Sequence, residues 1–97
     1  MTEARPAEAA FALELEQAWQ LNPQVALRDE SFGALAYHYG NRRLVFLKSR
    51  LLVELVSSLR DYPSAAAAIA ALVPEGQQPS YRRALARLAA SEVIDVR

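Results

Sequence analysis

The sequence predicts an α+β domain of winged-helix-like architecture, in which a three-stranded antiparallel β-meander is followed by three helices. Short alternating or apolar segments, separated by turn residues, fill residues 25–47, and amphipathic helical spacing follows from residue 49. A length of 97 residues is enough for one modest core. We expect an N-terminal helical extension over residues 1–21 and one folded domain over residues 22–97.

The N-terminal half is expected to supply one helix and the three strands. Ala7–Leu21 is rich in helix-forming residues and is followed by a proline, so we expect a helix there, with Trp19 as a packing anchor. A tight hairpin turn joins the last two strands, because Gly40 and Asn41 tolerate positive φ. The expected strands are Val25–Arg28, Ala34–Tyr39 and Arg42–Leu47.

Three helices and a short tail complete the predicted domain. The first helix is expected from the N-cap Ser49 through Arg60, the second over Ala65–Leu72 after the N-cap Ser64, and the last from residues 77–80 to about Ala90. In the last helix the expected buried face holds Tyr81, Leu85 and Leu88, with Ala84. Residues 93–96 are expected to form an extended tail that seals the core.

Composition argues against most kinds of catalytic site. The chain has no cysteine, a single histidine and a formal charge of +0, so we expect no catalytic residue, no metal, no cofactor and no nucleic acid partner. Strand alternation points His38 away from Tyr37 and Tyr39, which disfavours a proton-transfer site. The apolar runs are short and the N-terminus does not look like a signal peptide, so we expect a cytoplasmic protein without a membrane partner.

The third predicted strand, Arg42–Leu47, is last in the meander and therefore lies at an open edge of the sheet. Such an edge is either a self-association hazard, which would give a homodimer, or a docking site for an extended peptide. Basic residues gather beside it and in the last helix, and would form a cationic strip if the two elements are neighbours. They are Arg42, Arg43, Lys48 and Arg50, with Arg82, Arg83 and Arg87.

A winged-helix DNA-binding regulator has the same predicted topology and is the alternative function. In that hypothesis the arginines of the last helix face the DNA, and Arg42 and Arg43 reach phosphate from the hairpin. The balanced charge gives no basic footprint, and the last helix lacks a face rich in Asn and Gln for reading bases. DNA binding is therefore the weaker hypothesis.

Several motifs together resemble the peptide chaperones of mycofactocin biosynthesis, within the PqqD-like recognition elements of modified ribosomal peptides. In chain order they are PQVALR at residues 23–28, FGAL at 32–35, YH at 37–38, FLK at 46–48 and QPxYxxAL at 78–85. The resemblance covers residues 19–97. The wider group often has Leu-Asn where the third strand meets the first helix, and here Leu47-Lys48 stands instead, so Ser49 is the expected cap.

The resemblance implies a non-catalytic module that binds the leader of a short precursor peptide and presents the peptide to a radical S-adenosylmethionine (SAM) maturase. The leader would add as a fourth strand beside Arg43–Leu47, with side chains in a groove against the last helix. Arg43 and Arg82 would favour an acidic leader. The implied peptide-binding residues are Arg42, Arg43, Leu44, Val45, Phe46, Leu47, Tyr81, Arg82, Leu85 and Leu88.

Overall fold

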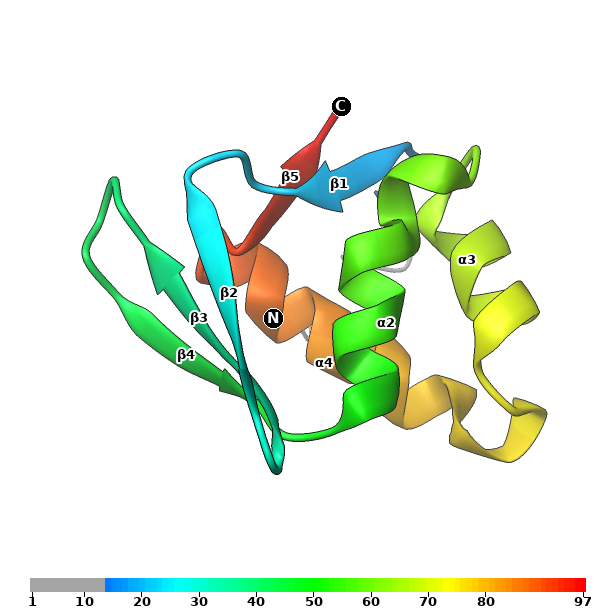
Figure 1. The fold of residues 1–97 in the computed structure, drawn as a ribbon. Helices are drawn as coiled ribbons and strands as arrows, with labels where there is room; N and C mark the ends of the chain where they lie inside the picture. Colours follow the sequence, from blue (N-terminus) through cyan, green and yellow to red (C-terminus); the bar gives the residue numbers. More distant parts are fainter. Residues whose placement is uncertain (1–13) are drawn as a thin grey trace, which may run out of the picture.

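A three-stranded antiparallel sheet packs against helices in the computed structural model, which describes residues 14–97 (Figure 1). The strands are β1 (Trp19–Leu21), β2 (Val25–Glu30), β3 (Gly33–His38), β4 (Leu44–Leu47) and β5 (Ile94–Val96). The helices are α2 (Arg50–Ser58), α3 (Ala65–Leu72) and α4 (Gln78–Ala90), with short 3-10 turns at Leu59–Asp61 and Glu75–Gln77. The predicted α+β class, with a β-meander followed by helices, is confirmed.

The meander has the order β2-β3-β4, and β4 is shorter than the expected strand Arg42–Leu47. Arg42 and Arg43 belong to the hairpin connection, where the left-handed residue is Arg42, with a φ of 65°. The turn lies between the two expected strands, but neither Gly40 nor Asn41, which were expected to tolerate positive φ there, adopts it. Arg42 N–H donates to the His38 carbonyl at 2.7 Å, and this bond closes a four-residue loop.

The imidazole of His38 explains this loop conformation. Its Nδ1 atom accepts hydrogen bonds from the backbone N–H groups of Gly40 (2.9 Å) and Asn41 (3.1 Å), so both amides turn toward one point. The ring is only 3% exposed, and strand alternation places it on the face opposite Tyr37 and Tyr39, as predicted. His38 is thus a structural cap of the hairpin.

The predicted helix Ala7–Leu21 is wrong at its C-terminal end. Residues 7–13 lie outside the described part of the chain, and Trp19–Leu21 forms strand β1, which pairs antiparallel with β5. This non-local pairing outweighs the local helix propensity because it joins the two ends of the domain and buries Trp19, which is 5% exposed. The proposed boundary at residue 21 stays a prediction.

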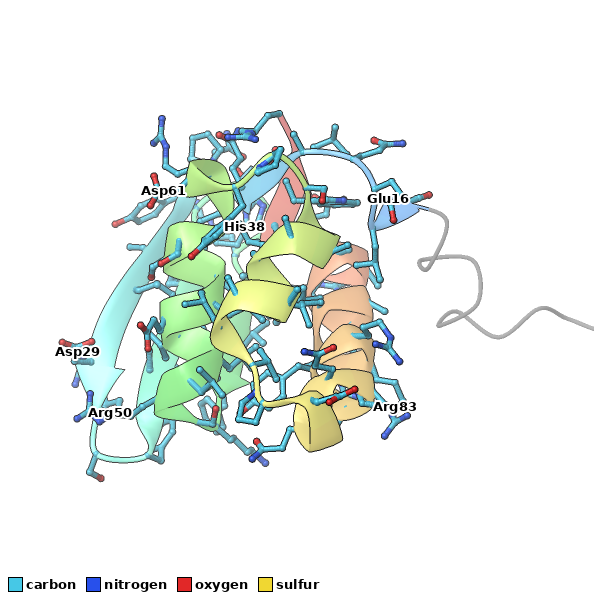
Figure 2. All side chains as sticks on the ribbon, turned by 90° about the vertical axis from the view of Figure 1, so that its right-hand side faces the viewer. Glu16, Asp29, His38, Arg50, Asp61 and Arg83 are labelled. Carbon is cyan, nitrogen blue, oxygen red and sulfur yellow. The ribbon has the colours of Figure 1, made fainter. Side chains whose placement is uncertain are left out.

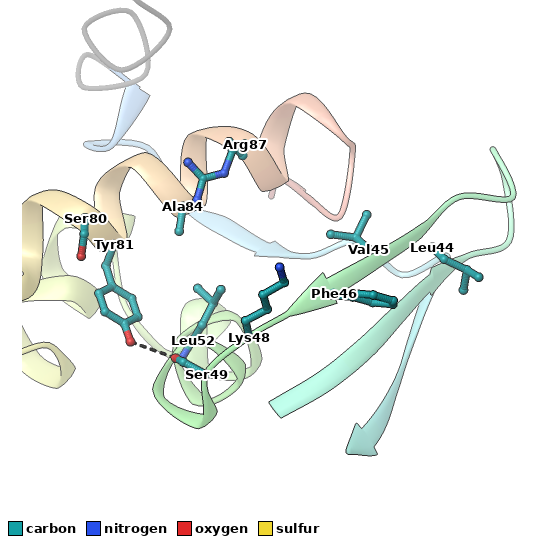
Figure 3. A pocket seen from close by; sticks show the side chains of 10 residues that line it. All are labelled: Leu44, Val45, Phe46, Lys48, Ser49, Leu52, Ser80, Tyr81, Ala84 and Arg87. Carbon is teal, nitrogen blue, oxygen red and sulfur yellow. Dashed lines mark hydrogen bonds between the residues drawn. The ribbon is translucent and has the colours of Figure 1, made fainter. Parts of the chain in front are cut away.

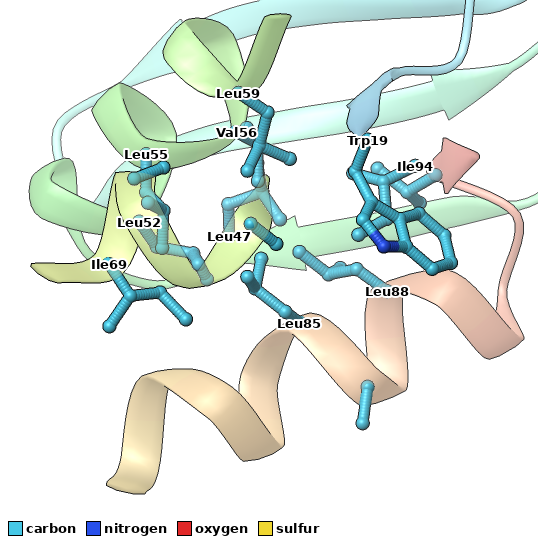
Figure 4. Close-up of a cluster of buried hydrophobic side chains, with 14 of the residues drawn as sticks. Trp19, Leu47, Leu52, Leu55, Val56, Leu59, Ile69, Leu85, Leu88 and Ile94 are labelled. Carbon is cyan, nitrogen blue, oxygen red and sulfur yellow. The ribbon is translucent and has the colours of Figure 1, made fainter. Parts of the chain in front are cut away.

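The hydrophobic core lies between the inner face of the sheet, α2, α3 and α4 (Figure 4). Leu47 of β4, Leu55 of α2 and Leu85 of α4 are each 0% exposed. The tail also contributes, since Val93 and Ile94 are 1% exposed, which confirms that it seals the core.

Both predicted serine caps are confirmed. Ser49 Oγ accepts the backbone N–H of Leu52 at 2.9 Å, and Ser64 Oγ accepts that of Ala67 at 3.1 Å. Only Lys48 and Ser49 separate the end of β4 from the start of α2 at Arg50, so a very short connection joins the edge strand to this helix.

Replacing Gly33 by Ala should lower the free energy of unfolding by about 2–4 kcal/mol. Gly33 has a φ of 148°, and a Cβ there would collide with the carbonyl oxygen of Leu47 at the end of β4. The matched control is Gly76→Ala, because a Cβ at Gly76 has no atom within 4 Å. Chemical denaturation of the two variants measures the difference. An equal stability would show that β3 and β4 can separate at this point without cost.

Candidate functional site

Strand β4 forms an edge of the sheet, and within residues 14–97 no strand pairs with its outer side. His38 N–H donates to the Arg43 carbonyl at 3.0 Å, which makes this couple a hydrogen-bonded pair of the antiparallel ladder. Hydrogen-bonded and non-bonded pairs alternate, so the register from Ala34↔Leu47 to Tyr37↔Leu44 assigns the bonds of Val45 and Leu47 to β3. Leu44 and Phe46 therefore direct their N–H and C=O groups outward.

The two edges of the sheet differ in how they are protected. The β2 edge ends in Arg28, Asp29 and Glu30, with an Arg28–Glu30 ion pair of 3.1 Å, and charges of this kind discourage strand addition. Strand β4 has the sequence LVFL and carries no charge, proline or bulge that would block another strand. Among residues 14–97, the β4 edge is therefore the one left open to pairing.

A groove of about 710 Å³ runs between β4 and α4 (Figure 3). Its walls come from β4, from the segment that joins β4 to α2, and from one face of α4. The lining residues are Leu44, Val45, Phe46, Lys48, Ser49, Leu52, Ser80, Tyr81, Ala84 and Arg87.

Side chains alternate along β4. Val45 is half-buried and points toward α4, whereas Leu44 and Phe46 are each 59% exposed and point away from it (Figure 3). Leu47 is fully buried in the core. An added strand would therefore meet an apolar surface on both sides of β4.

At one end of the groove, a hydrogen bond joins the segment between β4 and α2 to helix α4. The hydroxyl groups of Ser49 and Tyr81 lie 2.8 Å apart (Figure 3). Because Ser49 also caps α2, its position is fixed by the Leu52 amide, and this in turn orients the Tyr81 ring. The spacing of the two walls at this end is thus set by one polar contact.

The structure separates the predicted peptide-binding residues into three groups. Leu44, Val45, Phe46 and Tyr81 line the groove, whereas Leu47, Leu85 and Leu88 lie in the core with 0%, 0% and 4% exposure. Arg42 and Arg43 lie in the exposed hairpin connection, and Arg82 is half-buried on α4 but does not line the groove.

Other groove residues were not singled out as binding residues from the sequence. On α4 the lining positions Tyr81, Ala84 and Arg87 recur every three residues, so they form a stripe beside the buried one. Ala84 was assigned to the buried stripe, and its small side chain leaves the space that forms the groove. The sequence shows the helical spacing of both stripes. It does not show which stripe faces β4, because that depends on how α4 is rotated about its axis.

The cationic residues do not form the single strip that the sequence suggested. Arg50 and Arg83 lie on opposite sides of the molecule (Figure 2). Lys48 and Arg87 do converge, since both line the groove, from opposite walls, and within the described residues neither has an ion-pair partner (Figure 3). These two cations are available to a carboxylate in the groove.

Comparison with known proteins places these features in a family. Residues 18–95 match the sequence model of the peptide chaperone MftB family. The chain belongs to this family. It is 51% identical to the peptide chaperone MftB of Mycolicibacterium smegmatis over 77 residues, which cover 78% of this chain and 76% of the relative.

Two further relatives extend the similarity over almost the whole chain. The peptide chaperone MftB of Mycobacterium ulcerans is 42% identical over 92 residues, covering 94% of this chain and 84% of the relative. That of Mycobacterium tuberculosis is 41% identical over 99 residues, covering 97% and 91%. No solved structure gives a significant match.

Membership of this family makes the chain a peptide chaperone rather than an enzyme. Within residues 14–97 no three His, Cys, Asp or Glu side chains are arranged to hold a metal ion. None of the described helices has the length and apolar character needed to cross a membrane.

The Ser49–Tyr81 contact predicts a specific pattern of stability losses. Tyr81→Phe should cost ~1 kcal/mol for the lost hydrogen bond, and Ser49→Ala should cost about 2 kcal/mol because it removes the helix cap as well. In the Ser49→Ala background, Tyr81→Phe should cost almost nothing further. Urea denaturation of the four proteins measures this cycle, and strictly additive losses would show that the two hydroxyls do not interact.

Proposed function

We propose that this chain captures the leader of a short ribosomal precursor peptide by β-strand addition to β4, and presents the peptide to a radical SAM maturase in mycofactocin biosynthesis. Membership of the peptide chaperone MftB family supports binding of a peptide, and the resemblance noted above supports the biosynthetic setting. The protein would act without chemistry of its own, in the cytoplasm, as a carrier between precursor and enzyme.

The observation that carries this proposal is the open edge of β4 beside the groove. Leu44 and Phe46 each offer one N–H and one C=O group outward, which a peptide strand would satisfy. Alternate side chains of that strand would enter the groove against Val45, Tyr81 and Ala84. Backbone pairing would position the leader, and the groove would select its side chains.

The two groove cations give the leader a chemical preference. A carboxylate that enters the groove would lie between Lys48 and Arg87, where the apolar walls weaken solvent screening. Arg43 and Arg82 would act on an acidic leader only from outside the groove. We propose a leader that is apolar with at least one acidic side chain directed into the groove.

Replacing Phe46 by proline should weaken precursor binding by about tenfold or more relative to Phe46→Ala. Proline removes an outward N–H and places its ring where the added strand would lie, yet it leaves the bonds from β4 to β3 in place. The alanine variant is the matched control, because both variants lose the same aromatic ring. Calorimetric titration with a synthetic short precursor peptide measures both affinities, and equal affinities would exclude strand addition at this edge.

Charge reversal distinguishes groove cations from peripheral ones. Arg87→Glu or Lys48→Glu should weaken binding of an acidic precursor by about tenfold, because each variant places like charge beside the bound carboxylate. Arg82→Glu and Arg43→Glu change the net charge equally, but neither residue lines the groove, so water and salt should screen their effect on the bound carboxylate and the loss should be smaller. Fluorescence anisotropy with labelled precursor compares the four variants. A uniform loss across them would indicate long-range attraction without a carboxylate site.

DNA binding is the competing function, and salt dependence separates it from peptide binding. A random DNA duplex should bind weakly or not at all, since the chain has a formal charge of +0. Tight duplex binding that is lost steeply as salt rises would instead favour a winged-helix regulator.

A further inference from the structure

Exposed apolar side chains cover the outer face of the sheet, on the side away from the helices. Phe32, Leu44 and Phe46 are 43%, 59% and 59% exposed, and we call these three residues the outer-face patch. The rings of Phe32 and Phe46 are in contact, with centroids 5.7 Å apart, so part of the patch is pre-ordered. Within the described residues nothing covers this patch.

Two residues of the patch, Leu44 and Phe46, lie on β4, the strand that forms one wall of the groove. Leu44 and Phe46 alternate with Val45 along β4, so the groove side and the outer side are two faces of one short strand (Figure 3). A strand that pairs with β4 cannot occupy one face alone, because its own side chains alternate in the same way. A strand that pairs with the open edge of β4 would therefore also place side chains over the patch.

The ladder pattern determines which peptide residues reach it. An antiparallel strand beside β4 would form hydrogen-bonded pairs opposite Leu44 and Phe46, and a non-bonded pair opposite Val45. Residues directly opposite each other share a face of the sheet. Two peptide side chains, separated by one intervening residue, would therefore contact Leu44 and Phe46. The residue between them would enter the groove.

We infer that the outer-face patch is a second half of the peptide-binding site, occupied by alternate side chains of the same leader segment that fills the groove. This inference rests on the proposed strand addition and names its substrate class. The bound segment carries apolar side chains at consecutive positions around the pairing centre, with any acidic residue on the groove side. A segment with strict alternation of apolar and polar residues would satisfy the groove alone.

The test is an alanine scan of the synthetic precursor against two proteins, the native chain and a Leu44→Thr/Phe46→Thr variant. Threonine retains β-propensity while removing most of the apolar area, and thermal unfolding checks that the variant is folded. The native chain should lose affinity by about fivefold or more at three consecutive peptide positions. The variant should bind the unmodified precursor about thirtyfold more weakly and, of these three positions, remain sensitive only at the middle one.

A groove variant separates failure of this inference from failure of the proposed function. Ala84→Phe would fill the groove from the α4 wall, whereas the side chains of Leu44 and Phe46 point away from α4. If Ala84→Phe abolishes binding while the threonine variant binds like the native chain, strand addition stands and the inference is overturned. If neither variant changes the affinity, both are overturned.

Two other occupants of the patch give distinct results. Sedimentation velocity over a range of concentrations detects a dimer through the β4 edge. A dimer that the threonine substitutions dissociate, with precursor affinity unchanged, would make the patch an interface between copies and overturn the inference. A pull-down with the purified maturase tests the other occupant. If the threonine variant loses only its binding to the maturase, and its alanine scan matches that of the native chain, the inference is also overturned.

Discussion

Burial of Leu47 between the sheet and α4 is the contact on which the open edge depends. An edge strand has ladder bonds on one side only, and β4 is four residues long, so its pairing with β3 contributes little by itself. Leu47 is fully buried with Leu85, and the Ser49 cap follows at once, which ties the end of β4 to two helices. The strand is held firmly from inside, and its outer side stays available.

The opposite end of β4 is held by a polar device instead of by burial of apolar groups. His38 accepts two loop amides, and the loop residue Asn41 accepts the Arg43 amide at 2.9 Å. These bonds set the hairpin so that β4 begins at Leu44 in register with Tyr37. Histidine is a catalytic residue in many proteins, but here His38 has a structural role and determines where strand β4 begins.

The elements that could be predicted from sequence are those governed by local signals. Ser49 and Ser64 cap their helices, and the two-residue period of a strand places Leu44 and Phe46 on one face of β4 and Val45 on the other, because both features depend only on nearby residues. Strand β1 could not be predicted in this way, since its partner β5 lies more than seventy residues away, as Leu21↔Ile94 illustrates. The groove cations depended on a similar non-local fact, the rotation of α4 that brings Arg87, instead of Arg82, to face Lys48.

Backbone pairing alone is too weak to hold a peptide at this edge. Leu44 and Phe46 present four outward groups, and at ~0.5–1.5 kcal/mol each they contribute about 4 kcal/mol in total. Association and ordering cost ~4–15 kcal/mol, so side-chain burial must supply the surplus. Burial of one or two apolar side chains in the groove adds ~1.5–3 kcal/mol each, and after the cost of association the total still falls short of the roughly −8 kcal/mol of micromolar affinity. A short strand therefore needs side-chain contacts on both of its faces, and β4 is apolar on both.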